Sequence, residues 1–219
     1  MKKYNIGITA NTCWYIHNFR LNTIRHLISK GYFVYVIAPV DEYTKRLTEL
    51  GVTHIDIYID QGGTNPLNDF RTLISFYKIY SSRIKLHVVL NFTPKNNIYS
   101  TVAAYLNGVK VINTIAGLGL IFINQGLMAK VVLSLYRFSQ RFADKVFFQN
   151  DDDKTAFLEN RIISESIADR LPGSGVDLDR FKFSPADNQN KTVFILVARM
   201  LYDKGVGHYV EAARYLKDK

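Results

Sequence analysis

Two basic residues near the end of the sequence are candidates for chemistry. Arg199 follows the apolar run 192–198, and Lys204 lies five residues further on, directly before Gly205 and a helical pattern. Arginine presents a planar fork of donors to phosphate oxygens, whereas the lysine ammonium is a mobile point charge. Glycine allows close backbone approach, and the N-terminus of the helix that follows is electropositive. The spacing fits a diphosphate site, and a solvated loop with two incidental cations is the alternative.

A second candidate is the glycine-containing segment 113–119, Asn-Thr-Ile-Ala-Gly-Leu-Gly. Gly117 and Gly119 permit a positive φ or the close approach of a ligand. The segment is not the dinucleotide-binding fingerprint, which requires G-x-G-x-x-G directly after the first strand. A plain turn therefore explains this segment as readily as a binding loop does.

Two further segments could line a pocket. Lys95 lies in a predicted loop, 91–97, that Pro94 stiffens, so its ammonium is placed to meet an anion or simply to face solvent. Aromatic side chains, His17 and Asn18 share the segment 14–19, after the first predicted strand. This segment fits a sugar or lipid pocket in which His17 is a general base, or a loop that only bonds to itself.

Apolar positions alternate with Lys130, Arg137 and Arg141 over the segment 121–142. Such a basic amphipathic helix either lies in an anionic membrane interface or packs on a sheet in the ordinary way. Asp151-Asp152-Asp153 is better explained as a helix N-terminus than as a metal site. Because no pair of histidines has a suitable spacing either, the sequence predicts no metal centre.

Composition narrows the class of protein. The 219 residues carry a net charge of +9, which an anionic substrate, an anionic membrane or a nucleic acid would explain. No basic arm or nucleic-acid signature is present, so no nucleic-acid partner is expected. There is no long uncharged apolar stretch or signal peptide, and the lone Cys13 fits a reducing cytosol. We therefore expect a cytoplasmic protein with a packed core.

Strand patterns alternate with helix patterns along the chain, which predicts an α/β fold with a doubly wound, mostly parallel, Rossmann-like sheet. The expected strands are 4–10, 33–38, 54–59, 86–90, 109–113, 145–148, 167–171 and 192–198. The expected helices are 19–30, 41–50, 66–80, one ending at 106, 126–142, 151–160 and 206–216.

The pattern breaks once, after residue 172. Residues 1–172 form the predicted sheet domain, residues 173–191 a linker, and residues 192–219 the first strand and helix of an incomplete second domain. Ligands of open parallel sheets bind beyond the carboxyl ends of the strands. This rule favours the segments that follow the predicted strands as the binding surface.

Seven segments in order give the chain a resemblance to the family 4 glycosyltransferases of the GT-B fold, especially the bacterial enzymes of capsule, O-antigen and glycan assembly. Those segments are 18–20 (Asn-Phe-Arg), 38–41 (Ala-Pro-Val-Asp), 91–99 (Asn-Phe-Thr-Pro-Lys with Ile-Tyr at its end), 113–119, 147–151 (Phe-Phe-Gln-Asn-Asp), 173–181 (Gly-Ser-Gly-Val-Asp with the final Phe) and 198–205 (Ala-Arg-Met-Leu-Tyr-Asp-Lys-Gly). The resemblance covers the whole chain.

The resemblance implies two Rossmann-like domains facing a cleft, the first for the acceptor and the second for a UDP-sugar donor. Arg199 and Lys204 would hold the donor diphosphate in place of a metal, with the anomeric configuration retained and no cofactor. The acceptor would be a lipid-linked or other glycan at the inner face of the plasma membrane. The acceptor-binding residues that the resemblance implies are Asn18, Arg20, Lys95, Asn113, Gly117, Gly119 and Asn150.

Two features depart from the family pattern. The E-x7-E element that contacts the donor does not occur within the 219 residues, and Ala116-Gly117 stand where many members carry a cleft histidine. The isolated chain is therefore expected to have little transferase activity, with residues 192–219 poorly packed. The alternative is a non-enzymatic acceptor-binding or membrane-binding module that needs a separate donor domain.

Overall fold

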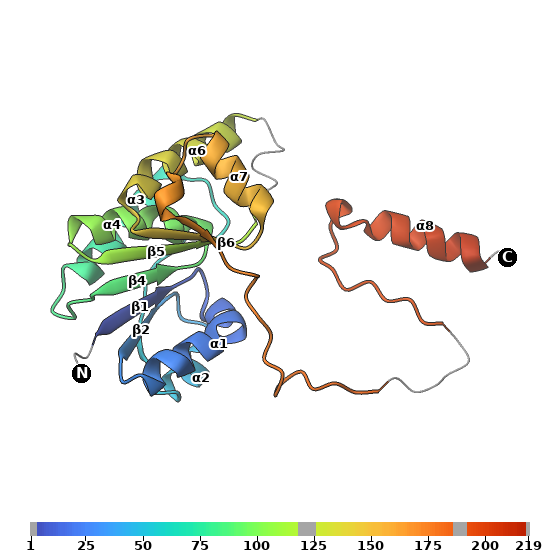
Figure 1. Ribbon diagram of the computed structural model, residues 1–219, viewed down its shortest axis with the longest axis horizontal. Helices are drawn as coiled ribbons and strands as arrows, with labels where there is room; N and C mark the ends of the chain where they lie inside the picture. Colours follow the sequence, from blue (N-terminus) through green and yellow to red (C-terminus); the bar gives the residue numbers. More distant parts are fainter. Residues whose placement is uncertain (1–3, 118–125, 186–191, 218–219) are drawn as a thin grey trace. The chain divides into compact units, whose positions relative to one another are not determined.

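The computed structural model describes residues 4–117, 126–185 and 192–217 of the chain (Figure 1). Its contacts divide the chain into two units, Met1–Asp177 and Leu178–Lys219. The first unit contains the whole sheet and the candidate pocket. The second contains the segment of Arg199 and Lys204.

Seven parallel strands form one sheet in the order β3-β2-β1-β4-β5-β6-β7, which confirms the predicted α/β fold. The order reverses between β1 and β4, so the crevice where such sheets bind ligands lies there. The strands are β1 (Asn5–Thr9), β2 (Phe33–Ile37), β3 (Thr53–Ile55), β4 (Val88–Asn91), β5 (Lys110–Ile115), β6 (Lys145–Phe148) and β7 (Ala168–Arg170).

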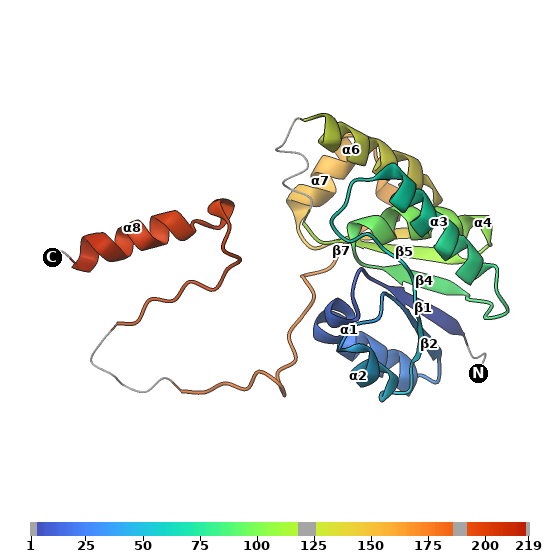
Figure 2. The same cartoon turned by 180° about the vertical axis from the view of Figure 1, so that it is seen from behind.

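Helices cover both faces of the sheet, as Figures 1 and 2 show. On one face lie α1 (Cys13–Ser29) and α2 (Thr44–Thr48), and on the other lie α3 (Pro66–Tyr80), α4 (Thr101–Leu106), α6 (Leu127–Ser139) and α7 (Asp151–Glu159). A π-helical segment (Asn96–Ser100) precedes α4, a 3-10 turn (Gln140–Phe142) follows α6, and another (Glu165–Ile167) precedes β7. No helix in the described ranges is long and apolar enough to cross a bilayer.

Helix α1 begins six residues earlier than the sequence pattern predicts. The Thr12 side chain accepts a hydrogen bond from the backbone N–H of Tyr15 at 3.0 Å and so caps the helix. The Asp41 carboxylate accepts from the backbone N–H of Trp14 at 2.8 Å and favours the same helix end. The expectation of a loop over 14–19 was therefore wrong, because these two caps stabilise a helix there.

Two predicted strands differ in the structure. The predicted strand 54–59 is reduced to β3, while Ile57 and Ile59 are buried outside the sheet. The run 192–198 forms no strand, and Val193 and Ile195 are 78% and 80% exposed. A strand requires a neighbouring strand for its ladder. The second unit offers none in the part that the structure describes, where α8 (Val206–Lys217) is its one long helix.

The burial of the Cys13 thiol reports how tightly α1 packs on the sheet. Its side chain is fully buried, and its sulfur lies 3.4 Å from the hydroxyl of Thr44. Burial raises the pKa of Cys13 from its ordinary 9.0 to about 11, against the opposing effect of the Thr44 hydrogen bond. The folded thiol thus keeps its proton where the unfolded one loses it, so the free energy of unfolding should fall as the pH rises from 9 towards 11.

At pH 8 we expect the native thiol to react with a disulfide reagent at least about 100-fold more slowly than the thiol in urea, because reaction needs an accessible thiolate. Absorbance of the released reagent measures both rates. Equal rates in the native and unfolded chains would show that the α1 interface is open.

Candidate functional site

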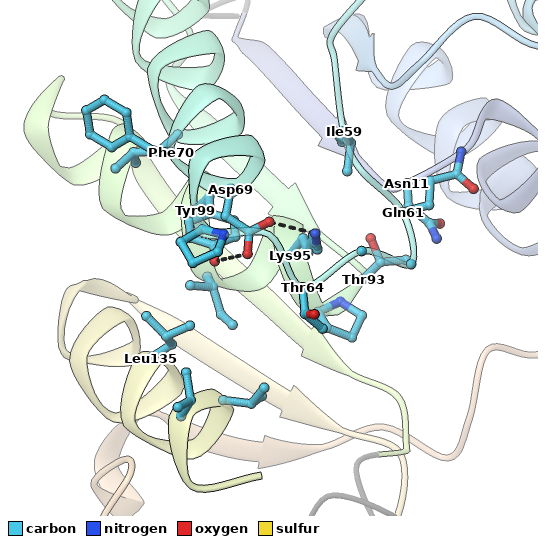
Figure 3. Close-up of a pocket in the computed structure, with 18 of the residues that line it drawn as sticks. Asn11, Ile59, Gln61, Thr64, Asp69, Phe70, Thr93, Lys95, Tyr99 and Leu135 are labelled. Atoms are coloured by element: carbon cyan, nitrogen blue, oxygen red, sulfur yellow. Dashed lines mark hydrogen bonds and ion pairs between the residues drawn. The ribbon is translucent and has the colours of Figure 1, made fainter. Parts of the chain in front are cut away.

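A pocket of about 630 Å³ opens where β1 and β4 end (Figure 3). Its walls come from residues 59–64 and helix α3, from residues 93–99 after β4, and from helix α6. Amide and hydroxyl side chains gather at one end, where Asn11, Gln61 and Thr93 lie close to the strand ends. The remaining wall is apolar and comes chiefly from α3 and α6. Its members include Phe70, Leu73, Ile98, Val131, Val132 and Leu135.

One polar cluster interrupts the apolar wall. The Lys95 ammonium lies 2.6 Å from one carboxylate oxygen of Asp69, and the Tyr99 hydroxyl donates to the other at 2.8 Å. The side chains of Lys95 and Asp69 are 17% and 18% exposed. Burial raises the pKa of the Tyr99 phenol, and the Asp69 carboxylate acts in the same direction. Tyr99 therefore remains a neutral donor.

This cluster corrects the expectation for Lys95. The residue lies in the first turn of a helical stretch rather than in a loop, and its ammonium already has an anionic partner. Asp69 and Lys95 are the charged residues among the described residues of the pocket wall, and they neutralise each other. The pocket therefore suits an uncharged amphipathic group, with hydroxyl groups at the amide end and hydrocarbon along α3 and α6.

A fully buried polar network includes Asn113 and bonds to the π-helical segment. The Asn113 amide donates to Gln140 at 2.6 Å and to Thr101 at 2.9 Å, and its oxygen accepts from Asn91 at 2.8 Å. The side chain has no exposed surface. Asn113 therefore lies inside the sheet, where its hydrogen bonds link β4, β5 and α4, and the expectation that it contacts an acceptor stays a prediction.

The π-helical segment supplies the acceptor that this network needs. The backbone carbonyl of Asn97 accepts from the Thr101 hydroxyl at 2.7 Å and from the Gln140 amide at 2.9 Å. Insertions of this kind inside helices are rare and frequently lie at functional sites. Here the segment joins β5, α4 and the turn after α6, and its Ile98 and Tyr99 line the pocket.

Two other expected acceptor contacts have local partners. Asn150 caps α7 by accepting from the backbone N–H of Asp153 at 2.7 Å, so it rather than the three aspartates caps the helix. Asn18 lies in α1 and donates to the carbonyl of Trp14 at 2.9 Å. Asn150 and Asn18 thus make hydrogen bonds that stabilise α7 and α1, and neither residue lines the pocket.

Gly117 adopts a φ of +79°, and a methyl group added to it would meet no atom within 4 Å. Glycine is thus favoured at position 117 by the positive φ of the backbone and not by a lack of space for a side chain. Gly119 and residues 121–125 of the expected membrane helix lie outside the described residues. Within α6, Tyr136 is buried and Leu135 packs on the core, so this helix packs on the sheet as the ordinary alternative predicted.

Arg199 and Lys204 belong to the second unit, and both are exposed. Lys204 ends a 3-10 turn (Tyr202–Lys204), Gly205 follows with a φ of +71°, and α8 then begins. The expected glycine and helix N-terminus therefore follow the lysine. The structure describes this unit by itself.

Sequence reasoning missed Asp69 and Gln140. Asp69 had a usable signal, since it lies in the first turn of the helix that begins at Pro66, near the carboxyl edge of the sheet. Gln140 had no such signal, because it lies in the basic amphipathic segment 121–142, where polar positions are expected to face solvent. The described residues contain no group of three His, Cys, Asp or Glu side chains placed to hold a metal ion.

The chain is similar to two bacterial transferases. It is 27% identical to an N,N'-diacetylbacillosaminyl-diphospho-undecaprenol alpha-1,3-N-acetylgalactosaminyltransferase of Campylobacter jejuni, over 98% of this chain and 61% of that protein. It is 28% identical to a UDP-Gal:alpha-D-GlcNAc-diphosphoundecaprenol alpha-1,3-galactosyltransferase of Escherichia coli, over 68% of this chain and 41% of that protein. The chain thus spans roughly half the length of these curated relatives.

A solved glycosyltransferase from Rickettsia africae shares the fold, with a TM-score of 0.57 and 17% identity over 83% of this chain and 46% of that one. Residues 9–150 match the family model described as glycosyl transferase 4-like. Because this match covers more than half of the sequence, the chain belongs to the glycosyl transferase 4-like family.

Proposed function

We propose that this chain supplies the acceptor side of a retaining hexosyltransferase, which moves a sugar from a UDP-sugar to a lipid-linked glycan during assembly of a cell-surface polysaccharide. The observation that carries the proposal is the amphipathic pocket at the carboxyl edge of the sheet, inside the region that matches the family. Its polar end suits sugar hydroxyls, and its apolar wall suits hydrocarbon of the lipid.

The names of the two relatives support this choice of substrates. Both name a sugar joined through a diphosphate to undecaprenol, and both name an alpha-1,3 transfer. One also names UDP-galactose as the donor. A UDP-hexose of this kind carries its diphosphate on the α face, so an α-linked product corresponds to retention of configuration.

In the proposed reaction an acceptor hydroxyl oxygen forms a bond to the anomeric carbon while the bond from that carbon to the UDP oxygen breaks. The hydroxyl proton leaves with the departing UDP or with solvent. Negative charge grows on the diphosphate, and Arg199 and Lys204 are the residues proposed to stabilise it without a metal. We expect no cofactor, since the UDP-sugar is itself the donor substrate.

A transfer assay tests the proposal. The intact gene product should move labelled sugar from UDP-Gal or UDP-GalNAc onto a polyprenyl-diphosphate-linked sugar, and digestion with an α-specific glycosidase should release it. Product that resists this enzyme but yields to a β-specific one would refute retention. No transfer to any lipid-linked acceptor from a panel of UDP-hexoses would refute the function.

Exposed apolar residues on α6 favour the second candidate, peripheral binding to an anionic membrane at the cytoplasmic face. Leu127 and Phe138 are 80% and 54% exposed, and the exposed Lys130 lies on the same helix. Apolar side chains beside a cation suit the headgroup region of such a membrane. The variant Leu127→Ser with Lys130→Glu should therefore co-sediment less with vesicles of phosphatidylglycerol, whereas Lys78→Glu on α3 should not. Equal sedimentation of both variants would remove α6 from the membrane contact.

A further inference from the structure

A buried arginine lies on the face of the sheet opposite the pocket. Arg20 projects from α1 and is 7% exposed, with its guanidinium carbon 4.1 Å from the ring centre of Phe92. Its Nη2 group donates to the hydroxyl of Tyr15 at 3.2 Å and to the hydroxyl of Ser174 at 3.1 Å. Both partners are neutral, so these bonds orient the guanidinium without neutralising it.

The Arg20 charge has no carboxylate partner among the residues that the structure describes. Its Nε atom is buried and makes no hydrogen bond within that part of the chain. Burying an unpaired cation is costly, and stacking of the guanidinium on an aromatic ring offsets only part of that cost. An anion is the group that would complete this environment.

The neighbours of Arg20 are also arranged as donors. The Gln149 amide donates to the Ser174 hydroxyl oxygen at 2.8 Å, and the same oxygen accepts from Arg20. Because that oxygen accepts twice, the hydroxyl proton of Ser174 is left to donate to a ligand. Gly173 and Gly175 flank the serine with φ of +81° and +74°, which shapes the loop around it.

The cluster lies where substrates of such sheets bind. Phe92 directly follows β4, Gln149 directly follows β6, and Ser174 lies in the loop after β7. All three positions are beyond carboxyl ends of strands, at the same edge as the pocket. A guanidinium fork, a hydroxyl and an amide that converge at this edge match the tetrahedral oxygens of a phosphoryl group.

We propose that Arg20, Ser174 and Gln149 form a phosphate-binding subsite. The inference deepens the proposed function, because both substrates of that reaction carry a diphosphate, one on the lipid-linked acceptor and one on the UDP-sugar. The subsite binds a diphosphate, a group that both substrates carry, and titration with one ligand of each kind distinguishes the two sources. Binding itself does not depend on transfer being observed.

Calorimetric titration of the 219-residue chain with geranyl diphosphate, UDP and inorganic phosphate tests the subsite. We expect a diphosphate ligand to bind, and Arg20→Gln to weaken it by at least about 10-fold through loss of the charged fork. A tighter complex with geranyl diphosphate assigns the site to the acceptor, and one with UDP assigns it to the donor. Binding of none of the three, or equal affinity in Arg20→Gln, overturns the proposal.

Arg46 provides the matched control, because its guanidinium lies 4.7 Å from the ring centre of Tyr43 but is exposed on α2. Arg46→Gln should bind the diphosphates like the parent chain, and an equal loss would mean that binding follows overall charge and would overturn the subsite. Circular dichroism verifies folding. If Arg20→Gln fails to fold, Ser174→Ala takes its place, with a loss of about 3-fold or more expected for one hydrogen bond.

The two proposals fail separately. If Arg20→Gln loses diphosphate binding but the intact gene product transfers no sugar, the subsite stands and the proposed function falls. If sugar is transferred while Arg20→Gln changes neither diphosphate affinity nor the KM of either substrate, the function stands and the subsite falls.

Discussion

Replacing Asn113 by leucine is expected to lower the free energy of unfolding of the 219-residue chain by about 3 kcal/mol or more. Leucine has the same branching and number of side-chain heavy atoms as asparagine but is bulkier, so the loss comes from broken hydrogen bonds and overpacking rather than from a cavity. Leucine would leave the Asn91 amide, the Gln140 carbonyl and the Thr101 hydroxyl without their bonds of 2.6–2.9 Å to Asn113. Urea unfolding followed by circular dichroism measures the change.

Asn107→Leu is the matched control, because the Asn107 amide makes its bond to the Ala103 carbonyl at 2.8 Å in a half-buried position. It should cost about 1 kcal/mol or less. The network also holds the backbone of Asn97, whose neighbours Ile98 and Tyr99 line the pocket, so Asn113→Leu should weaken binding of the lipid-linked acceptor more than Asn107→Leu does. Equal stability of the two variants would show that the buried network is not what holds this edge together.

Lys204→Ala and Arg199→Ala are each expected to lower kcat of the intact gene product by about 100- to 1,000-fold under the proposed function. Their charges would act on the diphosphate as the bond to the sugar breaks, so their loss should reduce kcat more than it raises KM for the UDP-sugar. Initial rates at saturating substrate measure the effect.

Arg214 offers a control in the same unit, because it is an exposed basic residue in the last turn of α8. Arg214→Ala should leave kcat within about 2-fold of the parent value. Activity of Lys204→Ala and Arg199→Ala within the same range would exclude these residues as the charge-stabilising pair. It would also remove the reason for expecting a metal-independent reaction.

The fold was predictable because its signals are local. Alternating strand and helix patterns gave the parallel sheet, and the predicted strand 145–148 coincides with β6. Helix α3 likewise begins at Pro66, where the sequence predicts it, with Asn65 as its cap. The start of α1 was missed because Thr12 was not recognised as a cap, although its residue type favours one.

The site was predicted less well because it depends on contacts between distant residues. The predicted strand ended at Asn113, whereas β5 continues to Ile115. Because the strand is two residues longer than predicted, Asn113 lies in the interior of the sheet and not at its edge. Lys95 pairs with Asp69, which lies 26 positions earlier in the chain. Such a pairing follows from the packing of α3 beside the π-helical segment, and no local spacing indicates it.

Photo-crosslinking of the acceptor tests the central claim most directly. A polyprenyl-diphosphate-linked sugar with a diazirine in its lipid chain, irradiated with the 219-residue chain, should label peptides from α3 and α6, whose Phe70, Val131 and Leu135 line the pocket. Excess unlabelled acceptor should abolish this labelling. Saturable labelling confined to peptides outside α3 and α6 would show that the acceptor binds elsewhere and would contradict the assignment of the pocket.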